Sequence, residues 1–238
     1  MKNKRIWLTG ASRGIGFETA KLLAKNDVTL FLSARRRESF DDVIQHFQSS
    51  EKVYIIPCDV SNSDNVKNAY AEIKEIKGGV DILINNAGIG IFKSFLETSE
   101  KDFDDTIATN LKGVFLCTKA VLPDMLENKG NGIIINILSV ATQTVFEGTA
   151  IYSASKSALL AMDRVLRNEV RSKGIRIIDI LPGATESDMW DEKTRAKFCD
   201  RMMQPVDVAK VIVNTIKMNM EERLITEEII MRPIGGDL

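Results

Sequence analysis

The stretch Lys4-Arg-Ile-Trp-Leu-Thr-Gly-Ala-Ser-Arg-Gly-Ile-Gly16 decides the fold of this chain. A short apolar run, Ile6 to Leu8, leads directly into a glycine-rich turn, and a helix is predicted from Ile15 to Lys25. The turn contains three glycines: Gly10, Gly14 and Gly16. Glycines let the backbone turn tightly and approach a ligand, and the free N–H groups at the start of the next helix favour an anion. The stretch therefore indicates a phosphate site, although this glycine spacing also occurs in ordinary strand-to-helix turns.

Six further strand-like runs alternate with helix-like stretches. They are Val28–Ser33, Lys52–Pro57, Val80–Asn85, Gly132–Leu138, Ile175–Leu181 and Ile225–Met231. Runs such as Ile133 to Leu138 are apolar at successive positions, which is typical of parallel strands covered by helices on both faces. No repeat or composition break marks a linker. We predict one α/β domain over residues 1–238, with a doubly wound (Rossmann) parallel sheet of about seven strands.

The composition narrows the possible partners. The chain has 238 residues and lacks the run of about 18 apolar residues that a membrane span needs. Its first apolar stretch is also too short for a secretory signal. Lys plus Arg number 32 and Asp plus Glu 33, so no overall charge recruits nucleic acid or an acidic surface. We expect a small-molecule partner, no nucleic acid and no membrane.

The cysteines and the histidine exclude several kinds of site. Cys58, Cys117 and Cys199 lie far apart and form no Cys-x-x-Cys motif, so we expect reduced thiols in a cytoplasm. The single histidine, His46, lies among glutamines and is expected at the surface. This removes a Ser-His-Asp triad and a multi-histidine metal site from consideration, and we expect no metal.

The segment Tyr152-Ser-Ala-Ser-Lys156 places a phenol and an ammonium on the same face of a predicted helix. A free phenol titrates near pH ~10, so a tyrosine exchanges protons near neutrality only where a positive charge stabilises its phenolate. Lys156 can supply that charge. Alone, the spacing is weak evidence in a chain with three tyrosines and many lysines. Its weight comes from the glycine-rich turn upstream.

With both segments present, the chain resembles the short-chain dehydrogenase/reductase family over nearly its whole length. The family's motifs appear in order as Thr9 to Gly16, Asp59-Val60, Asn85 to Gly88, Asn110 in Thr-Asn-Leu-Lys-Gly, Ser139, Tyr152 with Lys156, and Pro182-Gly183. Independent motifs at compatible spacings are not expected together by chance. The resemblance implies a nicotinamide-dependent oxidoreductase.

The resemblance implies a catalytic tetrad of Asn110, Ser139, Tyr152 and Lys156. Tyr152 would give its proton to a carbonyl oxygen while hydride moves from the nicotinamide to carbon. Lys156 would hold the nicotinamide ribose and lower the pKa of Tyr152, and Ser139 would polarise the substrate oxygen. Asn110 would bind a water for proton return. From the residues alone, Asn110 could instead bend its helix, and Ser139 could be a helix cap or a loop hydroxyl.

The resemblance also implies a set of cofactor-binding positions. These are Gly10, Ser12, Arg13, Gly14, Ile15, Gly16, Ser33, Arg35, Asp59, Val60, Asn86, Ala87, Gly88, Tyr152, Lys156, Pro182, Gly183, Thr185 and Ser187. Ser187 stands where relatives often have Thr, and its hydroxyl can reach the nicotinamide carboxamide.

The choice of cofactor is decided at the end of the second strand, where an acidic residue would bind the ribose hydroxyls of NAD. Ala34 stands there instead, and Arg35 and Arg13 could grip a phosphate through forked hydrogen bonds. We therefore expect NADP(H) rather than NAD(H). The alternative for Arg35 is a solvated charge run, which is our interpretation of Arg36 and Arg37.

The predicted substrate pocket is built from Gly90–Phe95, Ala141–Phe146 and Ala184–Trp190, with a lid at about 184–204. These segments are mainly small, apolar or aromatic and lack an arginine clamp, which suits an uncharged, flat carbonyl compound. Only the second of two small hydroxyl residues found in many relatives is kept, at Leu138-Ser139. The altered residue could change the pocket floor.

The Pro-Gly-Ala…Met-Trp segment and the tail Glu227 to Asp237 resemble bacterial sepiapterin-reductase-like members of the family. A 3-oxoacyl thioester reductase is the rival enzymatic interpretation. A dinucleotide sensor or scaffold without turnover is a third, which the intact tetrad disfavours.

The helices that contain Asn110 and Tyr152 carry more apolar residues than one buried stripe requires. These are Val114, Phe115, Cys117, Val121, Met125, Leu159, Leu160, Met162, Val165 and Leu166. In relatives, these two helices form subunit contacts. We therefore expect a homo-oligomer, a dimer at least and a homotetramer by resemblance.

Overall fold

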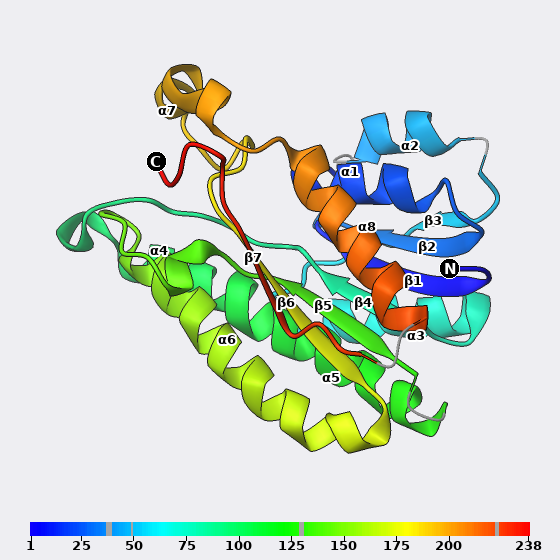
Figure 1. The fold of residues 1–238 in the computed structure, drawn as a ribbon. Coiled ribbons are helices and arrows are strands. Elements are labelled where there is room, and N and C mark those ends of the chain that lie inside the picture. The colour runs from blue at the N-terminus through cyan, green and yellow to red at the C-terminus, as the bar shows by residue number, and fades with distance from the viewer. Residues whose placement is uncertain (37–39, 49, 129–130, 222–223) are drawn as a thin grey trace.

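A computed structural model describes the chain except for residues 37–39, 49, 129–130 and 222–223; Arg37 of the predicted charge run lies outside the described residues. One parallel sheet has the order β3-β2-β1-β4-β5-β6-β7 and is enclosed by helices (Figure 1). The strands are β1 Lys4–Thr9, β2 Val28–Ser33, β3 Val53–Ile55, β4 Ile82–Asn85, β5 Ile133–Ile137, β6 Arg176–Pro182 and β7 Glu228–Met231. The predicted seven-stranded, doubly wound fold is confirmed.

The helices follow the strands in alternation. They are α1 Gly14–Leu23, α2 Asp41–Phe47, α3 Ser63–Lys77, α4 Glu100–Ile107, α5 Gly113–Glu127, α6 Ala150–Val170, α7 Glu192–Phe198 and α8 Pro205–Glu221. Short helical turns lie between them: η2 Phe95–Glu97, η3 Ala108–Lys112, η4 Val140–Thr142, η5 Arg171–Lys173 and η6 Cys199–Arg201. The predicted first strand and helix are both present.

The sheet is buried on both faces because its strands alternate between two cores. Ile6 and Leu8 of β1 join a hydrophobic cluster with residues of α1 and α8. Trp7 points to the other face, where it stacks on Tyr70 of α3 with ring centroids 5.9 Å apart. Burial on both faces explains why the strands are continuously apolar rather than alternating.

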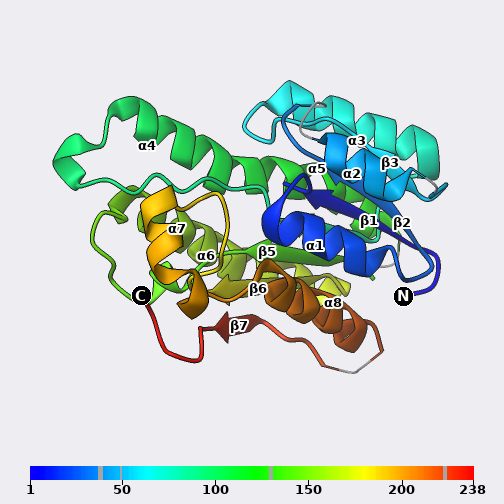
Figure 2. The same cartoon turned by 90° about the horizontal axis from the view of Figure 1, so that it is seen from above.

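The strand order reverses at β1, which lies between β2 and β4. In open parallel sheets, ligands bind beyond the carboxyl ends of the strands at such a reversal. The glycine-rich turn follows β1 there. Helix α7 lies beyond the same ends of the strands, as Figures 1 and 2 show from two directions.

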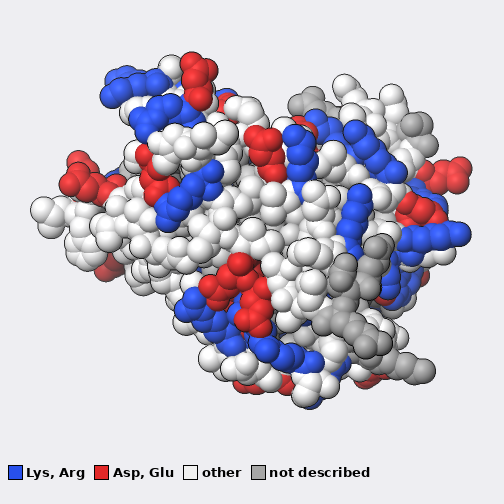
Figure 3. All heavy atoms as spheres, viewed as in Figure 1, with Lys and Arg blue, Asp and Glu red and all other residues white. Residues whose placement is uncertain are grey.

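The surface carries no dominant charge on the face drawn in Figure 3, where basic and acidic side chains are interspersed. This agrees with the formal net charge of −1. His46 of α2 is exposed, as predicted. Within the described residues, none of the helices is both long and apolar enough to cross a bilayer.

Candidate active site

The glycine-rich turn between β1 and α1 has the backbone shape that its sequence predicts. Gly10 and Gly14 have φ values of +64° and +55°, which only glycine adopts readily. A Cβ atom on Gly16 would lie 2.1 Å from the Gly10 carbonyl oxygen, and one on Gly10 would lie 2.8 Å from Cα of Ala87. The space beside Gly14 is open to 4 Å. The turn is thus closed toward the protein and open on one side.

The start of α1 offers donors to an anion. Arg13 occupies its N-cap position with an extended backbone and makes no side-chain cap. The first N–H groups of a helix have no partner within the helix, so an uncapped start presents donors and a positive dipole end. An uncapped helix beside an open glycine turn fits the pyrophosphate of a dinucleotide. Ser12 and Ile15, also predicted to bind the cofactor, lie in this half-buried turn.

The Asn86 side chain holds the glycine-rich turn in place. Its amide donates to the carbonyls of Thr9 at 3.1 Å and Gly10 at 2.9 Å, so it holds the glycine turn from behind. The Thr9 hydroxyl in turn accepts the backbone N–H groups of Asn86 and Ala87, both at 3.1 Å. These bonds join the loop after β4 to the loop after β1. The Asn86 side chain therefore positions the turn rather than facing a ligand.

Tyr152 and Lys156 lie on the first turns of α6, with the Lys156 ammonium 5.9 Å from the centroid of the Tyr152 ring. The ammonium is buried and donates to the Ile137 carbonyl at the end of β5, at 2.8 Å. Burial lowers the pKa of Lys156 to about 8. A β-carbon on Gly88 would lie 3.7 Å from this ammonium, so the loop after β4 borders the pair.

Burial has the largest effect on the pKa of Tyr152. Burial raises it above the ordinary phenol value, and the hydroxyl of Ser139 opposes the rise without cancelling it. The physical reason is that desolvation of a phenolate outweighs the stabilisation it receives. In the free protein, Tyr152 is a protonated acid at neutral pH.

Asn110 is completely buried in η3, a π-helical turn between α4 and α5. Its side chain makes two bonds of 2.9 Å to the backbone of Ile89 and donates to the Ser155 hydroxyl at 3.2 Å. A π turn inserts an extra residue, which redirects side chains and is common at functional sites. Asn110 thus lies where its helix departs from α geometry, and it links that helix to the loop after β4 and to α6.

Ser139 lies two residues beyond β5 and is buried. Its hydroxyl oxygen accepts the N–H of Ala141 at 3.1 Å, which caps the short helix η4. A hydroxyl that accepts from the backbone still has its own proton to donate. Ser139 therefore serves as a cap and also has a donor for the Tyr152 side of the site. The two functions are compatible.

The corner predicted to bind the NADP phosphate is partly built as expected. Arg35 is exposed just after β2, beside buried Ala34. Arg13 is also exposed but pairs with Asp188 at 3.3 Å. Ser33, included among the cofactor residues, is fully buried: its hydroxyl donates to the Ile56 carbonyl at 2.6 Å and accepts from the indole of Trp7. The Ser33 side chain therefore belongs to the sheet interior.

Asp59 and Val60 follow β3. One carboxylate oxygen of Asp59 accepts from the N–H and the hydroxyl of Ser61, at 3.0 and 2.7 Å. Val60 is buried against Gly113, whose Cβ would lie 2.8 Å from a Val60 methyl. This contact holds the loop after β3 against α5.

The segment between β6 and α8 contains α7 and is tied at both ends. Thr185 bridges to Met203, and the Thr185 hydroxyl donates to the Gly183 carbonyl at 3.0 Å. The backbone N–H of Gly183, next to Pro182, donates to Met231 of β7 at 2.7 Å. Ser187 accepts the N–H of Met189 at 3.4 Å.

Aromatic rings connect this segment to the predicted acid. Phe92 lies edge-on to Tyr152 with centroids 5.5 Å apart, and its centroid is 5.3 Å from that of Trp190. Trp190 is held by a bond of 2.9 Å from its indole to the Thr185 carbonyl. Met189 packs so closely on Gly90 that a Cβ there would lie 2.7 Å from its sulfur. Two predicted pocket segments thus meet over Tyr152.

Comparisons with known proteins agree with this arrangement. The family of short chain dehydrogenases matches residues 4–197. The chain is 33% identical to sepiapterin reductase of Chlorobaculum tepidum, over 98% of this chain and 97% of that protein. It is 34% identical to the 3-oxoacyl-[acyl-carrier-protein] reductase FabG of Staphylococcus epidermidis, over 79% of this chain and 77% of that one.

A solved structure of a metagenomic short-chain oxidoreductase in complex with NADP aligns with a TM-score of 0.82 and 28% identity, covering 98% of this chain and 97% of that chain. The sheet order, the glycine turn and the Tyr152–Lys156 helix all lie within the aligned length. On sequence and fold together, this chain belongs to the short-chain dehydrogenase/reductase family of oxidoreductases.

Proposed function

We propose that the protein is an NADP(H)-dependent carbonyl reductase that acts through Asn110, Ser139, Tyr152 and Lys156. The observation that carries the proposal is the convergence of a protonated phenol and a buried ammonium beside an open, uncapped phosphate turn. A protein that only senses a dinucleotide has no need for a desolvated acid and cation at that place. The non-catalytic alternative is therefore disfavoured.

The four residues divide the work of reducing a carbonyl. The bound, reduced nicotinamide supplies hydride to the carbonyl carbon. Tyr152 gives its proton to the carbonyl oxygen, which completes the alcohol, and Ser139 donates a hydrogen bond that polarises the same oxygen. Lys156 stabilises the phenolate that remains, and Asn110 holds the route for proton return.

The pKa directions fit the assigned roles of an acid and a charge that stabilises its conjugate base. Burial raises the pKa of Tyr152, so the phenol enters the reaction with its proton. The pKa of Lys156 is about 8, so its ammonium is largely charged at neutral pH and can stabilise a phenolate only once one forms. An interaction that strengthens as charge develops lowers the barrier.

The preference for NADP(H) rests on Arg35 just after β2 and on Arg13 at the start of α1, with no acid at Ala34. The NADP complex of a structural relative supports the same cofactor. We expect Arg35→Ala to shift the ratio of kcat/KM toward NADH by about ten- to a hundredfold, because one charge-assisted contact contributes roughly 1.5–3 kcal/mol. Arg36→Ala is the matched control and should change the ratio little. An unchanged ratio in Arg35→Ala would assign the phosphate to other residues.

The substrate we propose is an uncharged, flat carbonyl compound. Phe92 lies edge-on to Tyr152 and contacts Trp190, and Arg195 in the segment over the site is already paired with Glu186 and Asp188 at 2.6 and 2.9 Å. The identity to a sepiapterin reductase supports this class. The identity to FabG makes a 3-oxoacyl thioester the second candidate.

The deciding experiment follows NADPH absorbance with diketones, quinones, pterins and acetoacetyl thioesters. Turnover of a ring compound with no turnover of the thioester supports the proposal, and the reverse supports the second candidate. Tyr152→Phe is the control for each positive substrate. Tight NADPH binding without turnover of any substrate would indicate a sensor.

We also propose a cytoplasmic homo-oligomer. Phe115 of α5 and Val165 of α6 are 44% and 60% exposed in the single chain, while Val114, Leu159 and their neighbours on the other face are buried. An apolar side chain left in water on each helix favours pairing with a second copy. Light scattering should give a multiple of 26.5 kDa, and the mass of one chain would contradict the proposal.

A further inference from the structure

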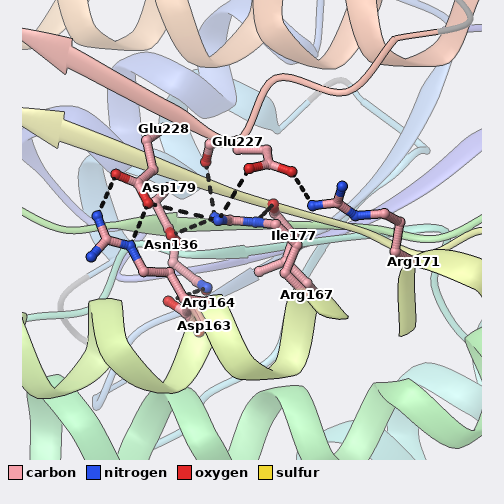
Figure 4. A network of polar contacts seen from close by, with 9 residues as sticks. All are labelled: Asn136, Asp163, Arg164, Arg167, Arg171, Ile177, Asp179, Glu227 and Glu228. Atoms are coloured by element: carbon pink, nitrogen blue, oxygen red, sulfur yellow. Dashed lines mark hydrogen bonds and ion pairs between the residues drawn. The ribbon is translucent and has the colours of Figure 1, made fainter. Parts of the chain in front are cut away.

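A second group of buried charges lies at the other end of α6, away from Tyr152. Figure 4 shows side chains from β5, α6, η5, β6 and the chain around the start of β7 that form one polar network around Arg167. The charged members are Asp163, Arg164, Arg167, Arg171, Asp179, Glu227 and Glu228. We refer to these seven residues as the α6 charge cluster. None of them has a part in the proposed reaction.

Arg167 is the centre of the cluster and is 3% exposed. Its guanidinium donates to Asp179 at 2.8 Å, to the Ile177 carbonyl at 3.1 Å and to the Glu227 carbonyl at 3.1 Å. It therefore binds β6 and the chain leading into β7 from the catalytic helix. A buried charge with this many partners is well satisfied.

Two buried carboxyl groups lie beside it and are linked through Asn136, which is the strand partner of Asp179 and donates to Asp163. Asp163 is 1% exposed and accepts from the amide of Asn136 at 2.9 Å, and Asp179 is 0% exposed. One Asp179 oxygen, Oδ2, accepts from Arg167, but the other, Oδ1, is buried without any donor among the described residues. A buried carboxylate oxygen with no donor is costly, which indicates that a proton lies between the two carboxyl groups.

The charge count of the α6 charge cluster agrees. It contains four carboxyl groups, on Asp163, Asp179, Glu227 and Glu228, and three guanidinium groups, on Arg164, Arg167 and Arg171. Its buried members, Asp163, Asp179 and Arg167, carry two carboxyl groups and one guanidinium, so they balance only if one carboxyl group keeps a proton. Asp163 is the candidate, because it alone of the four makes no ion pair with an arginine in the described part of the chain.

We propose that Asp163 keeps its proton at neutral pH and donates it to Oδ1 of Asp179, so that the two groups form a proton-holding clamp between the catalytic helix and the sheet. In this arrangement, Asp163 Oδ2 accepts from Asn136, and Asp179 accepts from Asp163 on one oxygen and from Arg167 on the other. Every buried polar atom of the pair is then satisfied.

The pKa directions agree with this placement of the proton. Burial, and then the neighbouring Asp179, raise the pKa of Asp163 well above its ordinary value. Burial also raises the pKa of Asp179, to about 6, while the hydrogen bond from Asp163 and the charge of Arg167 hold it down. Asp163 is thus the donor and Asp179 the acceptor near pH 7.

The clamp makes stability depend on pH. The pKa of Asp163 is higher in the folded than in the unfolded protein, so its stabilisation is complete at low pH and is lost as the pH rises through the folded value. The charged groups that face the pair are Arg167 on α6, Asp179 on β6, Glu228 on β7 and, toward the amino end of α6, Lys156. Loss of the proton adds an unpaired carboxylate to this set.

Two isosteric variants test the proposal with opposite expected results. Asp163→Asn keeps both a donor for Asp179 and an acceptor for Asn136, so its thermal midpoint at pH 7 should lie close to that of the wild type. Its midpoint should also fall less between pH 7 and 9. Asp179→Asn leaves Arg167 without its carboxylate, so its midpoint should drop by roughly 6–20 °C.

The proposal is overturned if Asp163→Asn is destabilised as much as Asp179→Asn, or if Asp179→Asn is the tolerated variant. A second measurement holds even if Asp179→Asn fails to fold. The wild type at pH 7 should show the infrared carbonyl band of a protonated carboxyl group, and this band should be missing in Asp163→Asn. A wild type without the band would place no proton in the clamp.

The pH profile of turnover is a further test, because a change in packing alone would not shift it. An ionised Asp163 would raise the pKa of Lys156 along the helix, whereas a protonated one would not. The alkaline limb of kcat should therefore lie at the same pH in Asp163→Asn as in the wild type. A limb shifted to lower pH in the variant would mean that Asp163 is ionised and would overturn the proposal.

Discussion

Helix α6 buries a positive charge in each of its halves, and the two are built differently. Lys156, near the amino end, is 5% exposed and donates to a single backbone carbonyl, that of Ile137. Arg167, near the other end, is 3% exposed and has a carboxylate and two carbonyls as partners. No carboxylate of the described chain lies within ion-pair distance of Lys156.

The difference separates a reactive charge from a structural one. A buried cation without an anion is destabilised, which is why burial lowers the pKa of Lys156 to about 8. A buried cation with a full set of partners holds elements together, and its loss leaves its partners unpaired. One helix thus holds a destabilised charge at the candidate site and a charge with a full set of partners two to three turns further along.

The largest expected effect comes from a substitution in the amino half of α6. Tyr152→Phe removes one oxygen and the proton donor, so kcat should fall by roughly 10²–10⁴-fold. The free energy of unfolding should change by less than about 1 kcal/mol, because the ring contact with Phe92 remains. Single-turnover kinetics with NADPH and urea unfolding measure the two quantities. Retention of more than about a tenth of kcat would mean that another group gives the proton.

The second-largest effect comes from a substitution in the carboxyl half of α6. Arg167→Met keeps the length and apolar volume of the side chain but leaves Asp179 buried without its cation. We expect a loss of roughly 3–5 kcal/mol in the free energy of unfolding, from urea denaturation. A loss below about 1 kcal/mol would contradict the structural assignment of this charge. NADPH affinity of the folded fraction should stay near wild type.

The fold, and the placement of Tyr152 and Lys156 on one helix, could be predicted because their signals are local. The continuous apolar strands, the glycine turn and the four-residue spacing of Tyr152 and Lys156 each lie within one segment. The predicted strand Lys52–Pro57 is longer than β3, Val53–Ile55, although backbone bonds to β2 continue on both sides of it, at Lys52 and at Ile56. Local patterns predict which elements form better than they predict where each element ends.

The α6 charge cluster could not be predicted, because its members come from separate strands and a helix. The available signal was a polar residue inside an apolar run: Asn136 among isoleucines and Asp179 likewise. Side-chain direction also could not be predicted. Ser33 and Asn86 occupy the expected positions, but their polar groups point into the protein. The partner of Arg13, Asp188, lies in the distant segment over the site.

A third prediction is that loss of Lys156, unlike loss of Arg167, stabilises the fold. Lys156→Met should raise the free energy of unfolding by about 1–2 kcal/mol at pH 7 while abolishing turnover, because a depressed ammonium pKa is a cost of folding. The expected gain is the folding cost of the lowered Lys156 pKa minus the contribution of the hydrogen bond to the Ile137 carbonyl that is lost. The cost is full below pH 8 and disappears as the pH approaches the unfolded value, so the gain should shrink at higher pH. Destabilisation at pH 7 would mean that the buried ammonium is well satisfied.

The smallest expected effect is the matched control for the carboxyl half. Arg164 lies three residues before Arg167 and also pairs with a carboxylate, since its guanidinium grips Glu228 through two bonds of 2.7 and 2.9 Å. Its side chain, however, is 55% exposed, so water and salt replace the pair when it is lost. Arg164→Met should therefore cost at most about 1 kcal/mol in urea unfolding, several times less than Arg167→Met. Equal losses in the two variants would show that position on the helix, rather than burial of the charge, determines how strongly these arginines hold α6 to β7.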